Sequence, residues 1–140
     1  MTRVEFYHNA PDKAEVAGKL AAKAYGAGQC ALLYTRDARL AAELDGLLWT
    51  RQQLSFLPHV RCDNPLAAQT PILIGDDAQP LSSPDLLINL AEDAPPCFSR
   101  FERVIEVVTG DEADRQAARE RYRFYRDRGY ELKVVDLAKR

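Results

Sequence analysis

Four short runs of apolar residues restrict the folds open to this chain more than any other feature. The runs are CALLYT at 30–35, PILIG at 71–75, DLLINL at 85–90 and RVIEVV at 103–108. Each has the length of a β-strand, and a strand that is apolar along most of its length needs cover on both faces. A parallel sheet between layers of helices provides that cover, so the runs predict the centre of such a sheet.

Segments with helical spacing separate or flank these runs. They cover residues 12–28, 37–49 and 111–128. In the first, Asp12 and Glu15 can form a capping box at the start, and Gly28 can end the helix. Further strands are expected at three places: 4–8, near 56–60 within an irregular stretch, and 130–137.

Strands and helices therefore alternate along the chain, and this alternation predicts an α/β fold. At 140 residues the chain has the usual length of one domain. We expect residues 1–140 to form a single three-layer domain, with a mainly parallel sheet and helices on both faces. The arrangement resembles a nucleotide-binding fold, but the first strand-to-helix turn, YHNAPDKAE, lacks the glycines of a phosphate-binding loop.

The composition is typical of a soluble globular protein, with 46% hydrophobic and 29% charged residues. A formal net charge of −2 disfavours a general nucleic-acid binder, which needs a basic surface. No apolar run approaches the length of a membrane span, and no signal-peptide pattern is present. Cys30, Cys62 and Cys97 form no CxxC pair, so we expect neither disulfides nor a zinc site, and a reducing cytoplasm.

The sequence shows no recognisable catalytic constellation. GxGxxG and GxxxxGK(S/T) are both absent, and Ser55 precedes His59 without the glycines of a nucleophile elbow. His8 and His59 have no acidic or cysteine neighbours at ligand spacing. We therefore expect no enzymatic activity, no cofactor and no metal, with a small nucleotide- or anion-binding α/β enzyme as the alternative.

The third helical segment carries a local excess of positive charge, because it contains six arginines against two acids between its first and last arginine. A helical wheel places Arg115, Arg119 and Arg126 in one stripe. Tyr122 lies beside the stripe, and Arg123 lies at its other edge. The helix is thus expected to have a basic face and a core face.

Arg121 falls within the apolar arc of this helix rather than in the stripe. The arc contains Ala113, Ala117, Ala118, Phe124 and Tyr125. A charge in such a position predicts a pairing with a carboxylate, which the sequence does not identify.

The arginine stripe has three interpretations. A basic stripe on a surface helix is usually only solvated, and arginine near the helix C-terminus complements the macrodipole. Arginines spaced by one turn beside a tyrosine also suit an acidic peptide that ends in an aromatic residue and a carboxylate. Direct binding of single-stranded DNA uses similar residues, although the net negative charge disfavours it.

A second candidate surface begins at Trp49, which lies away from the leucine arc of the second helix. Together with Phe56, Leu57 and Pro58 it could form one apolar patch outside the main sheet. Such a patch would mark a protein partner, since aromatic residues are typical anchors of interfaces. In the alternative, the irregular loop folds back and buries all four side chains.

Several of these segments resemble the chi subunit of bacterial DNA polymerase III holoenzyme. The resemblance rests on FYH, LDGLLW, SFLPH, DLLINL, FERVIEVV and ARERYRFYRDRGYEL, in the same order and at similar spacing. It covers nearly the whole chain. The combination of LDGLLW and SFLPH with the ARERYRFYR helix is specific, whereas each motif alone would be weak.

The resemblance implies a non-enzymatic accessory subunit of the clamp-loader assembly. Such a subunit binds the acidic C-terminal tail of single-stranded-DNA-binding protein and pairs with a psi subunit, so that its contact with DNA is mainly indirect. Arg119 and Tyr122 match the tail-binding residues of the family, and Arg115 and Arg123 occupy neighbouring basic positions.

By the same resemblance, Trp49 and Phe56 match the surface that meets psi, or in some bacteria a helicase-like protein. Two departures limit this correspondence. The segment RCDNPLAAQT is particular to this chain, and psi varies widely between bacteria.

Overall fold

The computed structural model of the chain describes residues 2–50 and 57–138. Within them, seven strands form one sheet: β1 (Arg3–Ala10), β2 (Ala31–Tyr34), β3 (His59–Arg61), β4 (Ile72–Gly75), β5 (Leu86–Asn89), β6 (Arg103–Thr109) and β7 (Glu131–Asp136). The helices are α1 (Lys13–Gly26), α2 (Ala38–Thr50) and α3 (Glu112–Asp127). The predicted order of strands and helices is confirmed.

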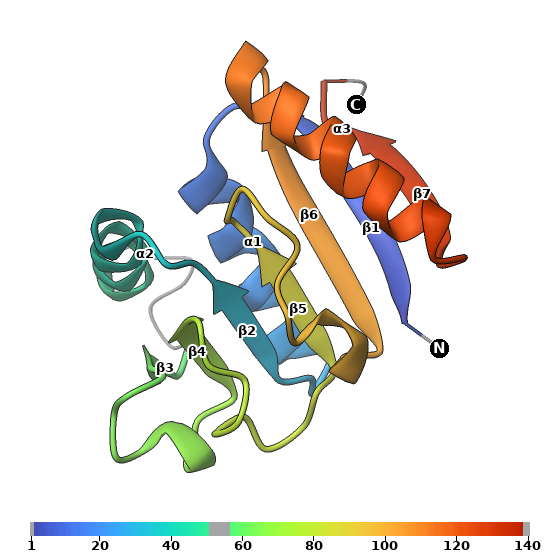
Figure 1. Cartoon of the computed structure of the whole chain (residues 1–140). Coiled ribbons are helices and arrows are strands. Elements are labelled where there is room, and N and C mark those ends of the chain that lie inside the picture. Colours follow the sequence, from blue (N-terminus) through green and yellow to red (C-terminus); the bar gives the residue numbers. More distant parts are fainter. Residues whose placement is uncertain (1, 51–56, 139–140) are drawn as a thin grey trace.

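All neighbouring strands are parallel, in the order β3-β4-β2-β5-β6-β1-β7. Helices α1 and α2 cover one face of the sheet, and α3 covers the other (Figure 1). The predicted three-layer α/β fold is therefore confirmed, and its sheet is parallel throughout the described part of the chain. β1 and β6 are neighbours in the sheet, but α1, which follows β1, packs on one face, and α3, which follows β6, packs on the other. The chain connections therefore run to opposite faces at this point of the sheet.

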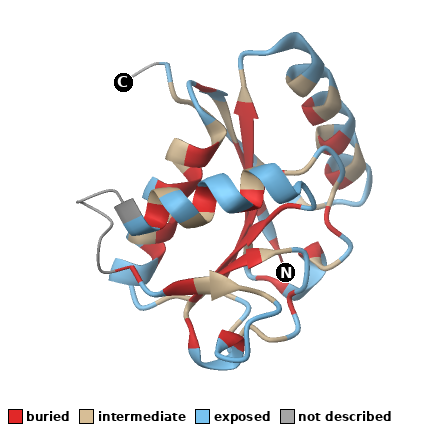
Figure 2. Cartoon of the chain, turned by 90° about the vertical axis from the view of Figure 1, so that its left-hand side faces the viewer, coloured by how far each residue is buried: buried red, intermediate tan, exposed pale blue. Residues whose placement is uncertain are grey.

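The sheet separates two apolar cores, because successive side chains along a strand point to opposite faces. Leu33, Ile74 and Ile88 face α1 and α2. Leu32 and Leu87 face the side that holds α3. Figure 2 shows buried residues on the central strands and on the inward sides of the helices, as the wholly apolar runs predicted.

Local capping explains where the helices begin and end. Asp12 is the N-cap of α1 and accepts a hydrogen bond from the backbone N of Glu15, as predicted, while Asp111 caps α3 in the same way. Gly28 and Gly129 follow the two helices with φ of 76° and 80°. In each case the next residue returns a backbone hydrogen bond to the last turn, which is the Schellman arrangement that glycine adopts without strain.

The irregular stretch between α2 and β4 differs in detail from the prediction. The strand expected near 56–60 lies at His59–Arg61, and Phe56 lies outside the described residues. Single turns of 3₁₀-helix occur at Ala67–Gln69 and Phe98–Arg100, where no regular structure was predicted. Such short turns have no periodicity for a sequence pattern to reveal.

No helix within residues 2–50 and 57–138 has both the length and the apolar character needed to cross a membrane. Cys30, Cys62 and Cys97 are free thiols and all three are partly buried.

The double-sided burial of β2 makes its leucines critical for stability. Leu33 is fully buried between the sheet and the two helices. We predict that Leu33→Ala lowers the free energy of unfolding by about 2 to 5 kcal/mol, because it removes buried apolar contacts and leaves a cavity. Urea unfolding followed by circular dichroism measures the change. Leu66→Ala, at a leucine that is 56% exposed, is the control; an equal loss in both variants would contradict the packing described.

Candidate functional site

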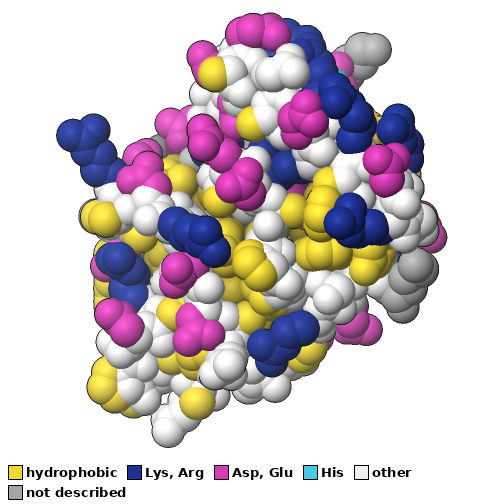
Figure 3. Space-filling model, in the orientation of Figure 1, with side chains coloured by type: hydrophobic (Ala, Val, Ile, Leu, Met, Phe, Trp, Pro, Cys, Tyr) yellow, Lys and Arg dark blue, Asp and Glu magenta, His cyan; other side chains and the backbone are white. Residues whose placement is uncertain are grey.

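The predicted basic stripe lies on the exposed side of α3. Arg115, Arg119, Arg123 and Arg126 are all exposed, and Figure 3 shows Lys and Arg side chains in a band along this helix. Asp111 and Asp114 start the helix and anchor it to the end of β6. The helix therefore holds the arginines at the surface in a fixed orientation.

Weak contacts partly neutralise the stripe. Arg119 donates to Gln116 Oε1 at 2.9 Å and lies 3.4 Å from Glu112 Oε2, while Arg123 pairs with Glu120 at 3.1 Å. Arg115 has no ion-pair partner among the described residues. Exposed ion pairs contribute little free energy, so an incoming carboxylate can replace them at small cost.

Tyr122, which the helical wheel placed beside the exposed arginine stripe, is half-buried rather than exposed. Its ring packs against Phe6 with centroids 5.5 Å apart. Phe6 pairs in register with Val134 of β7, which is 54% exposed. Tyr122 of α3 and Val134 of β7 thus contribute to an apolar surface next to the arginines.

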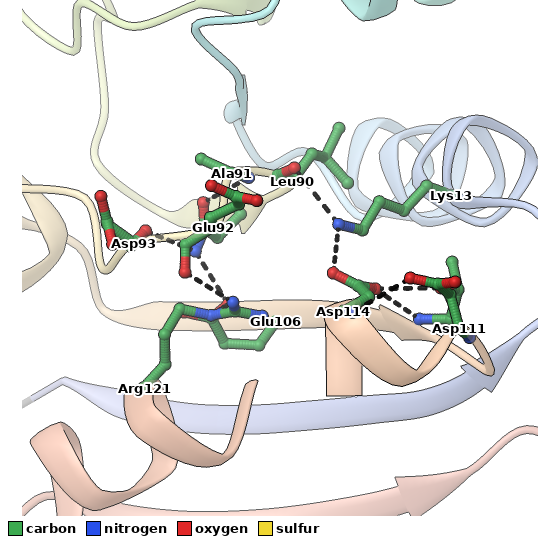
Figure 4. A network of polar contacts seen from close by, with 11 residues as sticks. Lys13, Leu90, Ala91, Glu92, Asp93, Glu106, Asp111, Asp114 and Arg121 are labelled. Carbon is green, nitrogen blue, oxygen red and sulfur yellow. Dashed lines mark hydrogen bonds and ion pairs between the residues drawn. The ribbon is translucent and has the colours of Figure 1, made fainter. Parts of the chain in front are cut away.

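The side chain of Arg121 points from α3 toward the sheet and belongs to a buried polar network (Figure 4). Its Nε donates to Glu106 Oε1 at 2.8 Å, and its Nη1 donates to the carbonyl of Glu92 at 2.7 Å. Tyr125 and Asn89 donate to the same carboxylate at 2.6 and 2.8 Å. The carboxylate partner that the sequence could not identify is therefore Glu106, in the middle of β6.

Burial raises the pKa of Glu106 above the ordinary carboxyl value, and Arg121 with the three hydrogen bonds opposes that rise. Every described partner of the carboxylate is a donor, which is the arrangement that suits the ionised form. Burial and the neighbouring charge of Glu106 also raise the pKa of the Tyr125 hydroxyl. The network therefore contains a carboxylate, a guanidinium and a neutral phenol.

The carboxyl ends of β1, β5 and β6 form the crevice where folds of this class often bind ligands. Here Lys13 of α1 spans it, donating to Asp114 at 2.9 Å and to the Leu90 carbonyl at 3.4 Å (Figure 4). The surrounding pocket has a volume of about 880 Å³ and is lined by several acidic side chains. Among the described residues, no group of three or more potential ligand side chains could hold a metal ion.

The second candidate surface is only partly as predicted. Trp49 is 68% exposed and points away from the core, and Pro58, which lies further along the chain, is exposed as well. Leu57, in contrast, is buried among the residues of α1 and α2, so its place in an exposed patch was wrong. Its side chain completes the core where the chain enters β3.

Trp49 rests on a fixed base. Its ring meets that of His59 edge-on at 5.3 Å. His59 is buried, and its two ring nitrogens contact the Leu57 carbonyl at 2.9 Å and Asp45 Oδ1 at 3.1 Å. His59 thus has a structural role, because it supports the ring of Trp49.

Comparison with known proteins agrees with these features. The family described as DNA polymerase III chi subunit, HolC, matches residues 1–133. The chain belongs to the chi-subunit family. The DNA polymerase III subunit chi of Pseudomonas aeruginosa is 40% identical over 94% of both chains. The subunit chi of Escherichia coli is 31% identical over 84% of this chain and 80% of its own.

A solved structure with the same fold is far more distant in sequence. The S. cerevisiae Dbp5 variant, solved with Nup159, Gle1, IP6 and ADP, matches with a TM-score of 0.62 and 14% identity. The match covers 97% of this chain and 41% of that chain, and at this identity it shows a common fold alone.

Family membership places the chain in DNA replication, as an accessory subunit of DNA polymerase III. It agrees with the expectation of a non-catalytic subunit. The chi subunit is part of the DNA polymerase III complex, so protein partners are expected for a member of this family.

The Lys13–Asp114 contact predicts a pH dependence of stability. Burial alone would raise the pKa of Asp114, but hydrogen bonds from the Thr109 backbone and from Lys13 outweigh it and lower this pKa. A lowered folded-state pKa stabilises the protein above the unfolded-state pKa, and this contribution is lost as the pH falls below about 5. Asp114→Asn should therefore lower stability at pH 7 and lessen its decline in acid.

Urea unfolding across this pH range measures the effect. Asp63→Asn, at an exposed aspartate, is the control and should leave both the stability and its pH profile unchanged. A pH profile in Asp114→Asn that is as steep as that of the wild type would contradict the assignment.

Proposed function

We propose that this chi-family subunit binds the acidic C-terminal tail of single-stranded-DNA-binding protein along the β7 side of α3. The supporting observation is the combination of exposed arginines with the half-buried Tyr122 and the exposed Val134. A carboxylate-rich peptide with a terminal aromatic residue needs both a cationic and an apolar contact. Contact with DNA is then mainly indirect, through the tail of the bound protein.

In this proposal Arg119 holds the terminal carboxylate or the aspartates of the tail, because a guanidinium can donate two parallel hydrogen bonds to a carboxylate. Arg115 and Arg123 add positive charge on either side. Tyr122 packs against the aromatic end of the tail, with its ring held in place by Phe6.

We further propose that Trp49 and Pro58 form the surface that meets a psi subunit, which would connect this chain to the clamp loader. Trp49 is a large exposed side chain on a rigid base, and such residues are typical centres of interfaces. Phe56 belongs to the same proposal from its position in the sequence, and Leu57 contributes as core support. A helicase-like repair protein is a further candidate for this surface, and the cytoplasm at the replication fork is the proposed location.

Tail binding can be tested with a fluorescently labelled peptide that copies the C-terminus of the organism's own single-stranded-DNA-binding protein. We predict saturable binding to the wild type by fluorescence anisotropy, weakened at least about tenfold in Arg119→Ala by the loss of charged hydrogen bonds. Binding should also weaken as salt rises. Arg100→Ala, at an exposed arginine away from α3, is the matched control.

Arg119 is exposed, so its replacement should change the free energy of unfolding by only about 0.5 kcal/mol or less. Equal affinity in wild type and Arg119→Ala would contradict the role of this residue. Binding of single-stranded DNA without the partner protein would instead favour direct contact with DNA.

The Trp49 surface has its own test. We predict that Trp49→Ala weakens binding to the psi subunit of the same organism by about 2 kcal/mol, or about thirtyfold, as removal of an interface anchor does. Isothermal titration calorimetry measures this. Tyr25→Ala, at another exposed aromatic residue, is the control, and an unchanged affinity in Trp49→Ala would exclude this surface as the psi contact.

A further inference from the structure

A groove runs along the flank of α3 opposite to the arginine stripe, between this helix and the loop that follows β5. It has a volume of about 730 Å³. Its walls include Ala94 of the loop and Ala113, Ala117, Glu120 and Phe124 of α3. On a helical wheel these α3 residues lie on the other side of the helix from Arg115, Arg119 and Tyr122. The groove is thus separate from the proposed tail-binding surface.

Arg121 also lines this groove, and one of its nitrogens has no hydrogen-bond partner in the part of the chain that the structure describes. The side chain is 2% exposed, with Nε bonded to Glu106 and Nη1 to the Glu92 carbonyl. Nη2 is buried without a hydrogen-bond acceptor among the described residues. Because buried donors are nearly always paired, this nitrogen is a candidate donor to an acceptor that comes from outside the chain.

Small side chains leave room for such an acceptor. Ala117 precedes Arg121 by one helical turn and is partly exposed, and Ala113 lies a further turn away. Ala94 stands in the facing loop, and Phe124 lies at the far end of the groove, where the Arg128 guanidinium carbon is 3.7 Å from the centroid of its ring. A ligand backbone can therefore approach α3 closely at this place, which larger side chains would prevent.

The charges at the rim select the kind of ligand. The side chains of Glu92 and Asp93 are exposed and have no ion-pair partner among the described residues, whereas Glu120 is paired with Arg123. In Figure 3 acidic side chains gather on this side of α3. An anion would be repelled here, and Arg121 is already neutralised by Glu106. A neutral acceptor with positive charges beside it fits both features.

We propose that this groove binds a basic, extended peptide segment of a partner protein. One backbone carbonyl of the segment accepts a hydrogen bond from Arg121 Nη2, its apolar side chains cover Ala113 and Ala117, and its lysines or arginines pair with Glu92 and Asp93. The α3 flank from Ala113 to Phe124 is about 16 Å long, which accommodates about five residues of extended chain.

The test uses a fluorescein-labelled, amidated peptide of alternating lysine and leucine, about six residues long to match the groove. We expect saturable binding to the wild-type protein by fluorescence anisotropy. The same peptide with glutamate in place of lysine should not bind. Equal binding of both peptides, or of neither, would overturn the proposal.

Two variants locate the site. Ala117→Leu places a larger side chain over Arg121 and should weaken binding at least about tenfold, because it blocks a hydrogen bond to a charged group. Ala42→Leu, at an exposed alanine of α2, is its control. The double variant Glu92→Gln/Asp93→Asn should also weaken binding, with Asp63→Asn/Glu102→Gln as control, since only the side chains are changed and the Glu92 carbonyl still accepts from Arg121.

Nuclear magnetic resonance gives the direct readout of the hydrogen bond. Addition of the lysine peptide should shift the guanidinium resonances of Arg121 and the amide resonances of Ala113 and Ala117. Shifts confined to the β7 side of α3 would overturn the proposal. Arg119→Ala should leave this binding unchanged, and Ala117→Leu should leave tail binding unchanged, so failure of one site is distinguishable from failure of the other.

Discussion

The buried ion pair between Arg121 and Glu106 holds α3 in its place on the sheet. It connects α3 to the middle of β6, and through Asn89 and the Glu92 carbonyl it also fixes the end of β5 and the loop beyond. Such a pair adds little net stability over an apolar replacement, but it is costly to break once buried. Its main effect is positional, because it sets the rotation of α3 about its own axis.

That rotation decides what each side of α3 presents. With Arg121 and Tyr125 turned toward the sheet, the arginine stripe must face β7, and the alanines must face the loop after β5. One helix thereby offers a cationic flank and an anionic groove on opposite sides. The two proposed sites thus differ in the sign of their charge, although the formal net charge of the chain is only −2.

The sequence predicted the fold well because its main signals are local. Apolar runs such as CALLYT predict strands wherever they pair, and Asp12 and Gly28 mark helix ends through contacts within a few residues. Details that depend on tertiary contacts were missed. Glu106 stands out as an acid within RVIEVV, but only the pairing of α3 over β6 makes it the partner of Arg121. Similarly, elements distant in sequence bury Leu57 and half-bury Tyr122, so the exposure of these residues could not be predicted.

The position of β1 in the sheet also has a consequence for synthesis. Its two neighbours are β6 and β7, so that Arg3 lies beside Arg103 and Glu131. At translation rates of about 5 to 20 residues per second, the first strand waits about 5 to 20 seconds for its first neighbour. Until then the backbone N–H and C=O groups of β1 have no neighbouring strand to pair with. The nascent chain can assemble the half of the sheet around β2 before β6 is synthesised, and it can close the other half only after β6 and β7 have followed.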